Sequence, residues 1–213
     1  NEELNTWETE RANFYKAVER HNAGADGAIL ITGNPGAGHH QLGLELARTI
    51  EGGKFYAVQS PSRLSEINVD SFEQAMFESA DVPNWQEYKT KLNPGDVIFF
   101  GNLENWFVKG SENEGLKEIF KFVSTYSGKL KIVFTCGINF YKLARTVTTL
   151  DSILQTTIVL SPVSAEVTIK ELMHRHRSGG LDLIVDGKEH EKMSQRELHR
   201  IYRRYHTLSG GNV

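Results

Sequence analysis

The sequence is nearly free of cysteine. Cys136 is the single cysteine among 213 residues, which excludes an internal disulfide and is typical of proteins from a reducing compartment. It lies in the apolar run KIVFTCG, where a small buried side chain is a commoner role than a reactive thiol. We therefore expect a cytoplasmic location and a buried, unreactive thiol.

Long apolar runs and a strong charge excess are absent as well. No run approaches the roughly 18 to 20 apolar residues that span a bilayer, and the polar N-terminal stretch NEELNTWETER lacks the features of a secretory signal. A net charge of −3 gives no general reason to expect contact with nucleic acid or membranes. The first residue is Asn rather than Met, so we expect a piece of a longer protein, which could carry targeting or membrane segments.

Short apolar runs alternate with helical patterns along most of the chain. The runs mostly do not alternate between apolar and polar residues, as in strands covered on both faces. They occupy residues 28–33, 54–58, 96–101, 130–137 and 156–160. Segments between them, such as HHQLGLELARTI and ENEGLKEIFKFVSTYS, repeat apolar residues at helical spacing. This order predicts an α/β fold with a parallel sheet and helices on both faces.

The alternation stops after about residue 162. A helix over 164–180 with Ser164 as N-cap, a short LDLIV run and a final helix SQRELHRIYRRYHTLSGG follow. We therefore expect an α/β core over residues 1–162 and the start of a smaller helical domain over 163–213. Residues 1–22 read as a helix ahead of the first strand, and residues 60–92 as one or two helices.

A glycine loop of the form G-x-x-x-x-G joins the first strand to the next helix. Glycines let successive backbone N–H groups and a helix N-terminus face an anion, which favours the anion by roughly 0.3–1 kcal/mol when exposed and up to about 2 kcal/mol when partly buried. The candidate phosphate-binding residues are Gly33, Asn34, Pro35, Gly36, Ala37, Gly38, His39 and His40.

Two histidines stand where a P-loop has Lys and then Ser or Thr. That Lys contacts the β- and γ-phosphates and the hydroxyl binds Mg²⁺. His39 is shorter and mostly neutral near pH 7. Because a charge-assisted hydrogen bond contributes roughly 1.5–3 kcal/mol, we expect nucleotide binding about ten- to a hundredfold weaker. His40 suits Zn, Cu or Ni better than Mg²⁺, and adjacent histidines do not share a helix face, so we expect no dedicated metal site. A turn without any ligand is the alternative.

Together with this loop, later segments resemble the AAA+ ATPase family over nearly the whole chain. DVIFFGNLENW occupies the Walker B position, KIVFTCGIN is similar to the sensor 1 strand, and YHTLSGGNV is similar to the start of the sensor 2 helix. Thr135 is the expected sensor 1 residue, with Asn139 as the alternative. The resemblance implies a five-stranded P-loop NTPase sheet in the order 5-1-4-3-2, a helical lid cut partway, and ATP or ADP as ligand.

The Walker B segment departs from the family pattern. Gly101 replaces the Asp that orients magnesium, and Asn102 replaces the Glu that activates water. Asp96 lies about 16 Å away at the other end of the strand. Glu104 lies beyond the strand and is expected as a solvated charge, although it could swing in. With both histidines, four chemical positions are changed. Because phosphoryl transfer depends on positioned metal and charge, we expect a degenerate site and doubt Mg²⁺ binding.

Arginines supply the remaining candidates. Arg145 lies in the interval where the family carries its arginine finger, and an exposed helix arginine is the alternative reading. A basic stripe on the last predicted helix, which we expect to be solvated rather than to bind nucleic acid, consists of Arg196, Arg200, Arg203 and Arg204.

The sequence thus predicts a degenerate AAA+ ATPase-like module that is catalytically impaired. It would act as a structural, interaction or weak nucleotide-binding domain of a larger protein. Its partners would be another protein, the rest of its own chain or an AAA+-type oligomer, without nucleic acid and without membrane contact in this segment. One alternative is a working ATP-hydrolysing domain with atypical residues, or one completed by a partner. Another is a DNA-associated module of the origin-recognition type.

Overall fold

The computed structural model describes residues 7–61, 67–108, 112–165, 167, 184–185, 187–189 and 192–209. The chain divides into two compact units. The first, here called the α/β unit, comprises Thr9–Asn34 and His39–Leu160. The second, here called the C-terminal unit, comprises Asn1–Glu8, Pro35–Gly38 and Ser161–Val213.

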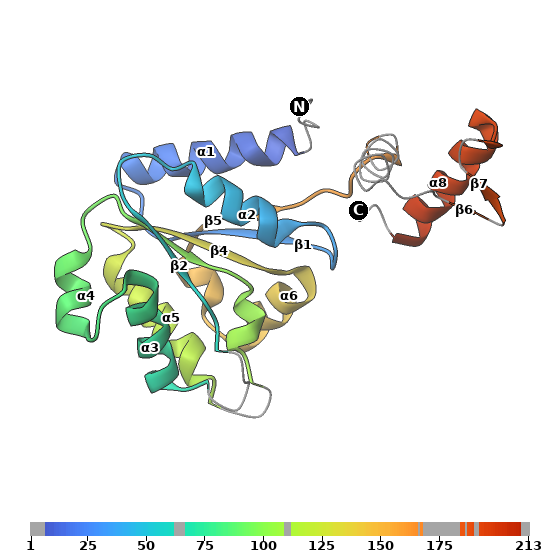
Figure 1. Ribbon diagram of the computed structural model, residues 1–213. Coiled ribbons are helices and arrows are strands. Elements are labelled where there is room, and N and C mark those ends of the chain that lie inside the picture. Colours follow the sequence, from blue (N-terminus) through green and yellow to red (C-terminus); the bar gives the residue numbers. More distant parts are fainter. Residues whose placement is uncertain are drawn as a thin grey trace. The chain divides into compact units, whose positions relative to one another are not determined.

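A parallel five-stranded sheet forms the centre of the α/β unit (Figure 1). Its strands are β1 (Ala28–Gly33), β2 (Phe55–Val58), β3 (Val97–Phe100), β4 (Lys131–Gly137) and β5 (Leu154–Val159). They lie side by side in the order β2-β3-β4-β1-β5. This is the predicted order 5-1-4-3-2 read from the other edge, so the predicted fold class is confirmed.

Helices cover both faces of the sheet (Figure 1). On one face lie α1 (Glu8–Asn22) and α2 (His39–Arg48), and on the other lie α3 (Val69–Ala80), α5 (Glu114–Tyr126) and α6 (Ile138–Val147). The excursion between β2 and β3 contains α3 and a second helix, α4 (Trp85–Lys91). There are two 3₁₀ turns among the described elements of this unit. The first, η2 (Leu103–Trp106), follows β3, and the second, η3 (Leu150–Ile153), precedes β5.

Burial explains why the strand sequences do not alternate. Every residue of β1 and β3 is buried, because helices pack on both sides of these central strands. Cys136 is fully buried in β4, and burial raises the pKa of its thiol to about 12. The expected burial of this thiol is confirmed. The buried Asp96 carboxylate accepts hydrogen bonds from the N–H groups of Lys54 and Asn93, so it ties loops together at the amino end of β3.

A glycine brings α2 close to the sheet. A Cβ at Gly43 would collide with Cγ2 of Thr135 on β4 and lie 3.5 Å from the Phe99 ring on β3. Without that Cβ, the first turn of α2 settles against the carboxyl ends of β3 and β4. Ligands of open parallel sheets bind at such ends.

The C-terminal unit contains the antiparallel pair β6 (Ile184–Val185) and β7 (Lys188–Glu189) and the helix α8 (Gln195–Ser209). A capping box starts α8: the Ser194 N–H donates to the Glu197 carboxylate at 2.9 Å, and the Glu197 N–H donates to the Ser194 hydroxyl. The hydrogen bonds that the Glu197 carboxylate accepts from the N–H and the hydroxyl of Ser194, with a further contribution from Lys188, lower its pKa to about 2. The predicted final helix is therefore confirmed.

The helix predicted over 164–180 lies mostly outside the described residues. At its expected start, the Val167 N–H donates to Ser164 Oγ at 3.3 Å, as the predicted N-cap requires. The assignment of residues 163–213 to a lid stays a prediction. None of the helices in the described ranges is both long and apolar enough to cross a membrane.

Candidate functional site

The glycine loop leaves the carboxyl end of β1. The last residue of that strand, Gly33, pairs with Gly137 at the end of β4. Within the loop, Gly36 and Gly38 have φ angles of 80° and 76°, in the left-handed region that glycine adopts without a steric penalty. The α2 helix then begins with no acidic residue in its first turn. The backbone therefore keeps the form and the helix end that favour an anion.

An aromatic residue that the sequence interpretation missed lies against this loop. In the C-terminal unit, the Trp7 indole N–H donates to the carbonyl of Ser161 at 3.0 Å. A Cβ at Gly38 would lie 3.5 Å from the Trp7 ring. The one available signal was an isolated tryptophan in the polar stretch NEELNTWETER. The half-buried indole of Trp7 therefore lies beside Gly38 of the loop.

His39, at the position of the P-loop lysine, is half-buried. Its Nδ1 is buried and has no hydrogen-bond partner. Burial lowers the pKa of this imidazole, although the negative charge of Glu104 opposes the shift. The side chain is therefore neutral near pH 7 and supplies no positive charge to a phosphate.

His40, at the position of the P-loop Ser or Thr, turns toward the sheet. Its Nδ1 lies 3.3 Å from the hydroxyl oxygen of Thr135. Its ring centroid lies 5.6 Å from that of Phe99, with the two rings inclined by 53°. A Cβ added to Gly101 would lie 2.9 Å from His40 Nδ1 and closer still to Cε1. The imidazole therefore occupies the space next to Gly101.

Asn102 and Thr135 are joined by a hydrogen bond. Asn102 has the left-handed backbone conformation, with φ 53° and ψ 64°, and its N–H donates to Thr135 Oγ1 at 3.0 Å. Thr135 is fully buried, and β4 continues beyond it to Gly137. Its hydroxyl oxygen accepts the hydrogen bond from Asn102 and also contacts the His40 imidazole. The alternative sensor residue, Asn139, is exposed on α6.

Glu104 is not the solvated charge that the sequence led us to expect. The η2 turn after β3 folds it back, so that its Oε1 accepts the Gly137 N–H at 3.1 Å. Its other oxygen, Oε2, is buried without a hydrogen-bond partner. That expectation is wrong because the turn aims the side chain at the end of β4. A carboxylate thus stands at the same sheet edge as Asn102.

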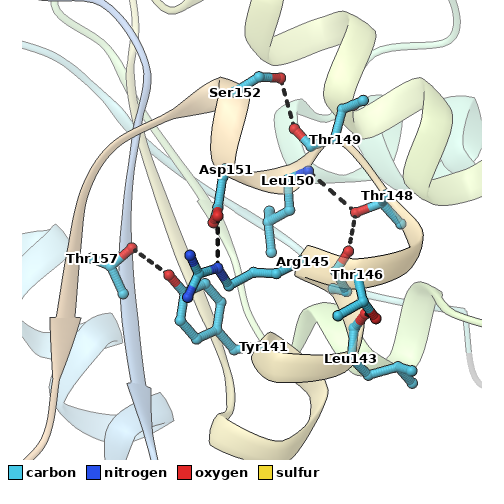
Figure 2. A network of polar contacts seen from close by, with 11 residues as sticks. Tyr141, Leu143, Arg145, Thr146, Thr148, Thr149, Leu150, Asp151, Ser152 and Thr157 are labelled. Carbon is cyan, nitrogen blue, oxygen red and sulfur yellow. Dashed lines mark hydrogen bonds and ion pairs between the residues drawn. The ribbon is translucent and has the colours of Figure 1, made fainter.

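Arg145 lies in a separate polar network on α6 and η3 (Figure 2). Its Nε donates to Asp151 Oδ2 at 2.6 Å, and its guanidinium carbon lies 5.3 Å from the Tyr141 ring centroid. The side chain is 51% exposed. Figure 2 shows that Arg145 points toward Asp151 and Tyr141, so the described contacts do not join it to the residues around Thr135.

The structure therefore brings together His40, Gly101, Asn102 and Thr135, with Glu104 at the same edge. In the described ranges, no three His, Cys, Asp or Glu side chains gather closely enough to hold a metal ion.

Comparison with known proteins identifies the fold but no sequence relative. No protein-family profile matches the chain, and no curated protein sequence does. The ORC2 protein of Aeropyrum pernix in its ADP form superposes with a TM-score of 0.60 at 10% identity, covering 96% of this chain and 58% of that one. A RuvB variant of Thermotoga maritima gives 0.51 at 14% identity, covering 97% and 64%. A Walker-type ATPase of Pyrococcus abyssi gives 0.52 at 15% identity, covering 91% and 62%.

These similarities establish an AAA+ P-loop NTPase fold. The chain spans less than two thirds of each of these solved structures. At such low identity, the similarity speaks for the fold and leaves the activity to the residues of the site.

Proposed function

From the AAA+ P-loop NTPase fold that this chain has, we propose that it is a catalytically impaired ATPase-like module. It holds ADP or ATP weakly through its glycine loop and does not hydrolyse ATP at a useful rate. Within a longer protein it serves as a structural or interaction domain, whose partner is another protein or a further part of the same chain.

One observation supports the impairment: the two residues that directly follow β3 carry no carboxylate. Gly101 and Asn102 replace the two carboxylates of the fold. The Thr135 hydroxyl oxygen accepts a hydrogen bond from the Asn102 N–H. The rate of phosphoryl transfer depends on positioned charge and on an oriented water. Without these groups little acceleration is left.

The weak binding rests on the loop backbone. Its glycine conformations and the start of α2 suit an anion, and Trp7 lies beside Gly38. One solved structure with the same fold, the Aeropyrum pernix ORC2 protein, was obtained as ADPNP and ADP complexes. The neutral His39 in place of Lys makes the expected affinity low.

Isothermal titration with ADP and ATP, together with a sensitive phosphate-release assay, tests both halves of the proposal. We expect weak binding that Gly38→Glu abolishes, and phosphate release at the rate of the protein-free control. Because Gly38 has a positive φ, Gly24→Glu serves as the matched control: Gly24 also has a positive φ, of 97°, an added Cβ there would meet no atom within 4 Å, and the residue lies outside the loop. Turnover comparable with ordinary AAA+ ATPases, lost in Gly38→Glu, would contradict the impairment.

Glu104 favours a second candidate, an ATPase that works with atypical residues. Its carboxylate is fixed at the end of β4 and keeps one oxygen, Oε2, without a hydrogen-bond partner. A partner subunit could then supply the remaining charges. This candidate predicts phosphate release on mixing with the partner protein, and its loss in Glu104→Gln but not in the exposed Glu112→Gln.

A further inference from the structure

We propose that the His40 imidazole fills the space in which a P-loop NTPase holds its magnesium ion, so that a nucleotide on this loop is bound without a metal. In this fold, magnesium is held between the P-loop Ser or Thr and the Walker B Asp. The position of the His40 ring does not depend on any ligand. The second half of the proposal, nucleotide binding without a metal, rests on the proposed function.

The ring of His40 lies where three elements meet. It extends from the first turn of α2, contacts the hydroxyl of Thr135 on β4 at 3.3 Å, and packs near Phe99 on β3. Its third neighbour is Gly101, directly after β3. The side chain therefore reaches from the Walker A position to the Walker B position, across the gap that a metal would bridge.

His40 and the side chain expected at position 101 exclude each other. An added Cβ at Gly101 would stand 2.9 Å from Nδ1, nearer than a Cβ atom approaches other heavy atoms in folded proteins, and nearer still to Cε1. It would also lie 3.1 Å from the Phe99 ring. An aspartate therefore requires a smaller residue at position 40 or a shift of the His40 ring. Two departures from the P-loop pattern, far apart in the sequence, are one structural change.

The residues at positions 40 and 101 do not suit magnesium. Mg²⁺ requires oxygen ligands in near-octahedral geometry, and it meets here an imidazole and a residue without a side chain. The nearby hydroxyl of Thr135 already accepts the Asn102 N–H and contacts His40. The residues at the two metal-holding positions therefore do not fit the ion.

A double-mutant cycle, with thermal stability as the measurement, tests whether His40 fills the space next to Gly101. We expect Gly101→Asp to lower Tm by roughly 3–10 °C, as overpacking does, and His40→Thr in the same chain to restore most of that loss. Gly101→Ala carries only the clashing Cβ and gives a milder second cycle if Gly101→Asp does not fold. Additive effects in the cycle that folds would overturn the proposal.

The neighbouring histidine gives a matched control. His39 lies in the same turn of α2 but is not among the atoms that a Cβ at Gly101 would meet. His39→Thr should therefore leave the Tm loss of Gly101→Asp unchanged. An equal rescue by His39→Thr would show that the loss is a general effect on the helix, and would also overturn the proposal.

ADP titration in EDTA and in excess Mg²⁺ tests the metal-free binding. The wild type should bind ADP equally well in both, whereas His40→Thr with Gly101→Asp should gain about tenfold or more from the metal. A magnesium-dependent ADP affinity in the wild type would contradict metal-free binding. If the wild type binds no ADP at all, the proposed function fails, and the stability cycle still decides whether His40 fills the space.

Discussion

At the scale of single residues, His39 determines how much charge the glycine loop offers a phosphate. The imidazole is half-buried, its Nδ1 has no partner, and desolvation lowers its pKa. A lowered pKa keeps the ring neutral at pH 7, where a lysine would carry a full charge. The loop backbone alone remains to attract the anion, and the helix end contributes only about 1 kcal/mol.

A lysine at this position should restore much of the missing affinity. We expect His39→Lys to tighten ATP binding by about ten- to a hundredfold, because a charge-assisted hydrogen bond contributes roughly 1.5–3 kcal/mol. Isothermal titration measures the change, and the neutral His39→Gln should bind like the wild type. An unchanged affinity of His39→Lys would show that phosphate does not reach the first turn of α2.

At the scale of elements, the packing of α2 on the sheet positions the residues of the site. Gly43 lets the helix approach β4 so closely that a Cβ would meet Thr135. The Thr135 hydroxyl in turn accepts the N–H of Asn102, which follows β3. The position of α2 therefore sets the spacing between the two halves of the site.

Two opposing effects decide the outcome of Gly43→Ala. Alanine favours a helix over glycine by roughly 0.5–1 kcal/mol, but overpacking against Thr135 costs about 1–3 kcal/mol. We expect a net loss of about 1–2 kcal/mol in the free energy of unfolding, measured by urea denaturation. The exposed Gln41→Ala on the same helix should stay within about 0.5 kcal/mol of the wild type. A stabilised Gly43→Ala would contradict the close packing of α2.

At the scale of the whole molecule, charge bears on the choice of partner. The net charge is −3, while α8 exposes a basic stripe. Three of its members, Arg196, Arg200 and Arg203, line a shallow hollow together with His199. A single helix face with this few cations neutralises few phosphates, so it supports loose rather than specific contact with nucleic acid.

We therefore expect only non-specific DNA binding, with a Kd of roughly 10⁻⁴–10⁻⁶ M at physiological salt. Fluorescence anisotropy with a labelled duplex measures it, and titration with salt should weaken it further. Tight binding that is lost when Arg200, Arg203 and Arg204 become alanine, and kept when Lys16 and Arg48 do, would favour the DNA-associated alternative.

The sequence was sufficient to predict the parallel sheet, because buried strands and amphipathic helices leave local patterns, whereas the order of the strands was implied by the resemblance to the AAA+ family. The position of the glycine loop was also readable, since its spacing and its place between a strand and a helix are local features. The direction of the Glu104 side chain could not be predicted, because it depends on the η2 turn and on an N–H of β4 that lies far away in the sequence. Trp7 was missed for the same reason, since its neighbour Gly38 belongs to another segment.

By itself, the sequence determined which side chains are missing from the P-loop pattern: no lysine at 39, no hydroxyl at 40 and no carboxylates at 101 and 102. Only the tertiary structure decided that two of these changes are one, because the His40 ring and a Cβ at Gly101 compete for the same volume. Residue types can be read from the sequence. The competition between the His40 ring and a side chain at position 101 arises only when folding brings α2, β3 and β4 together.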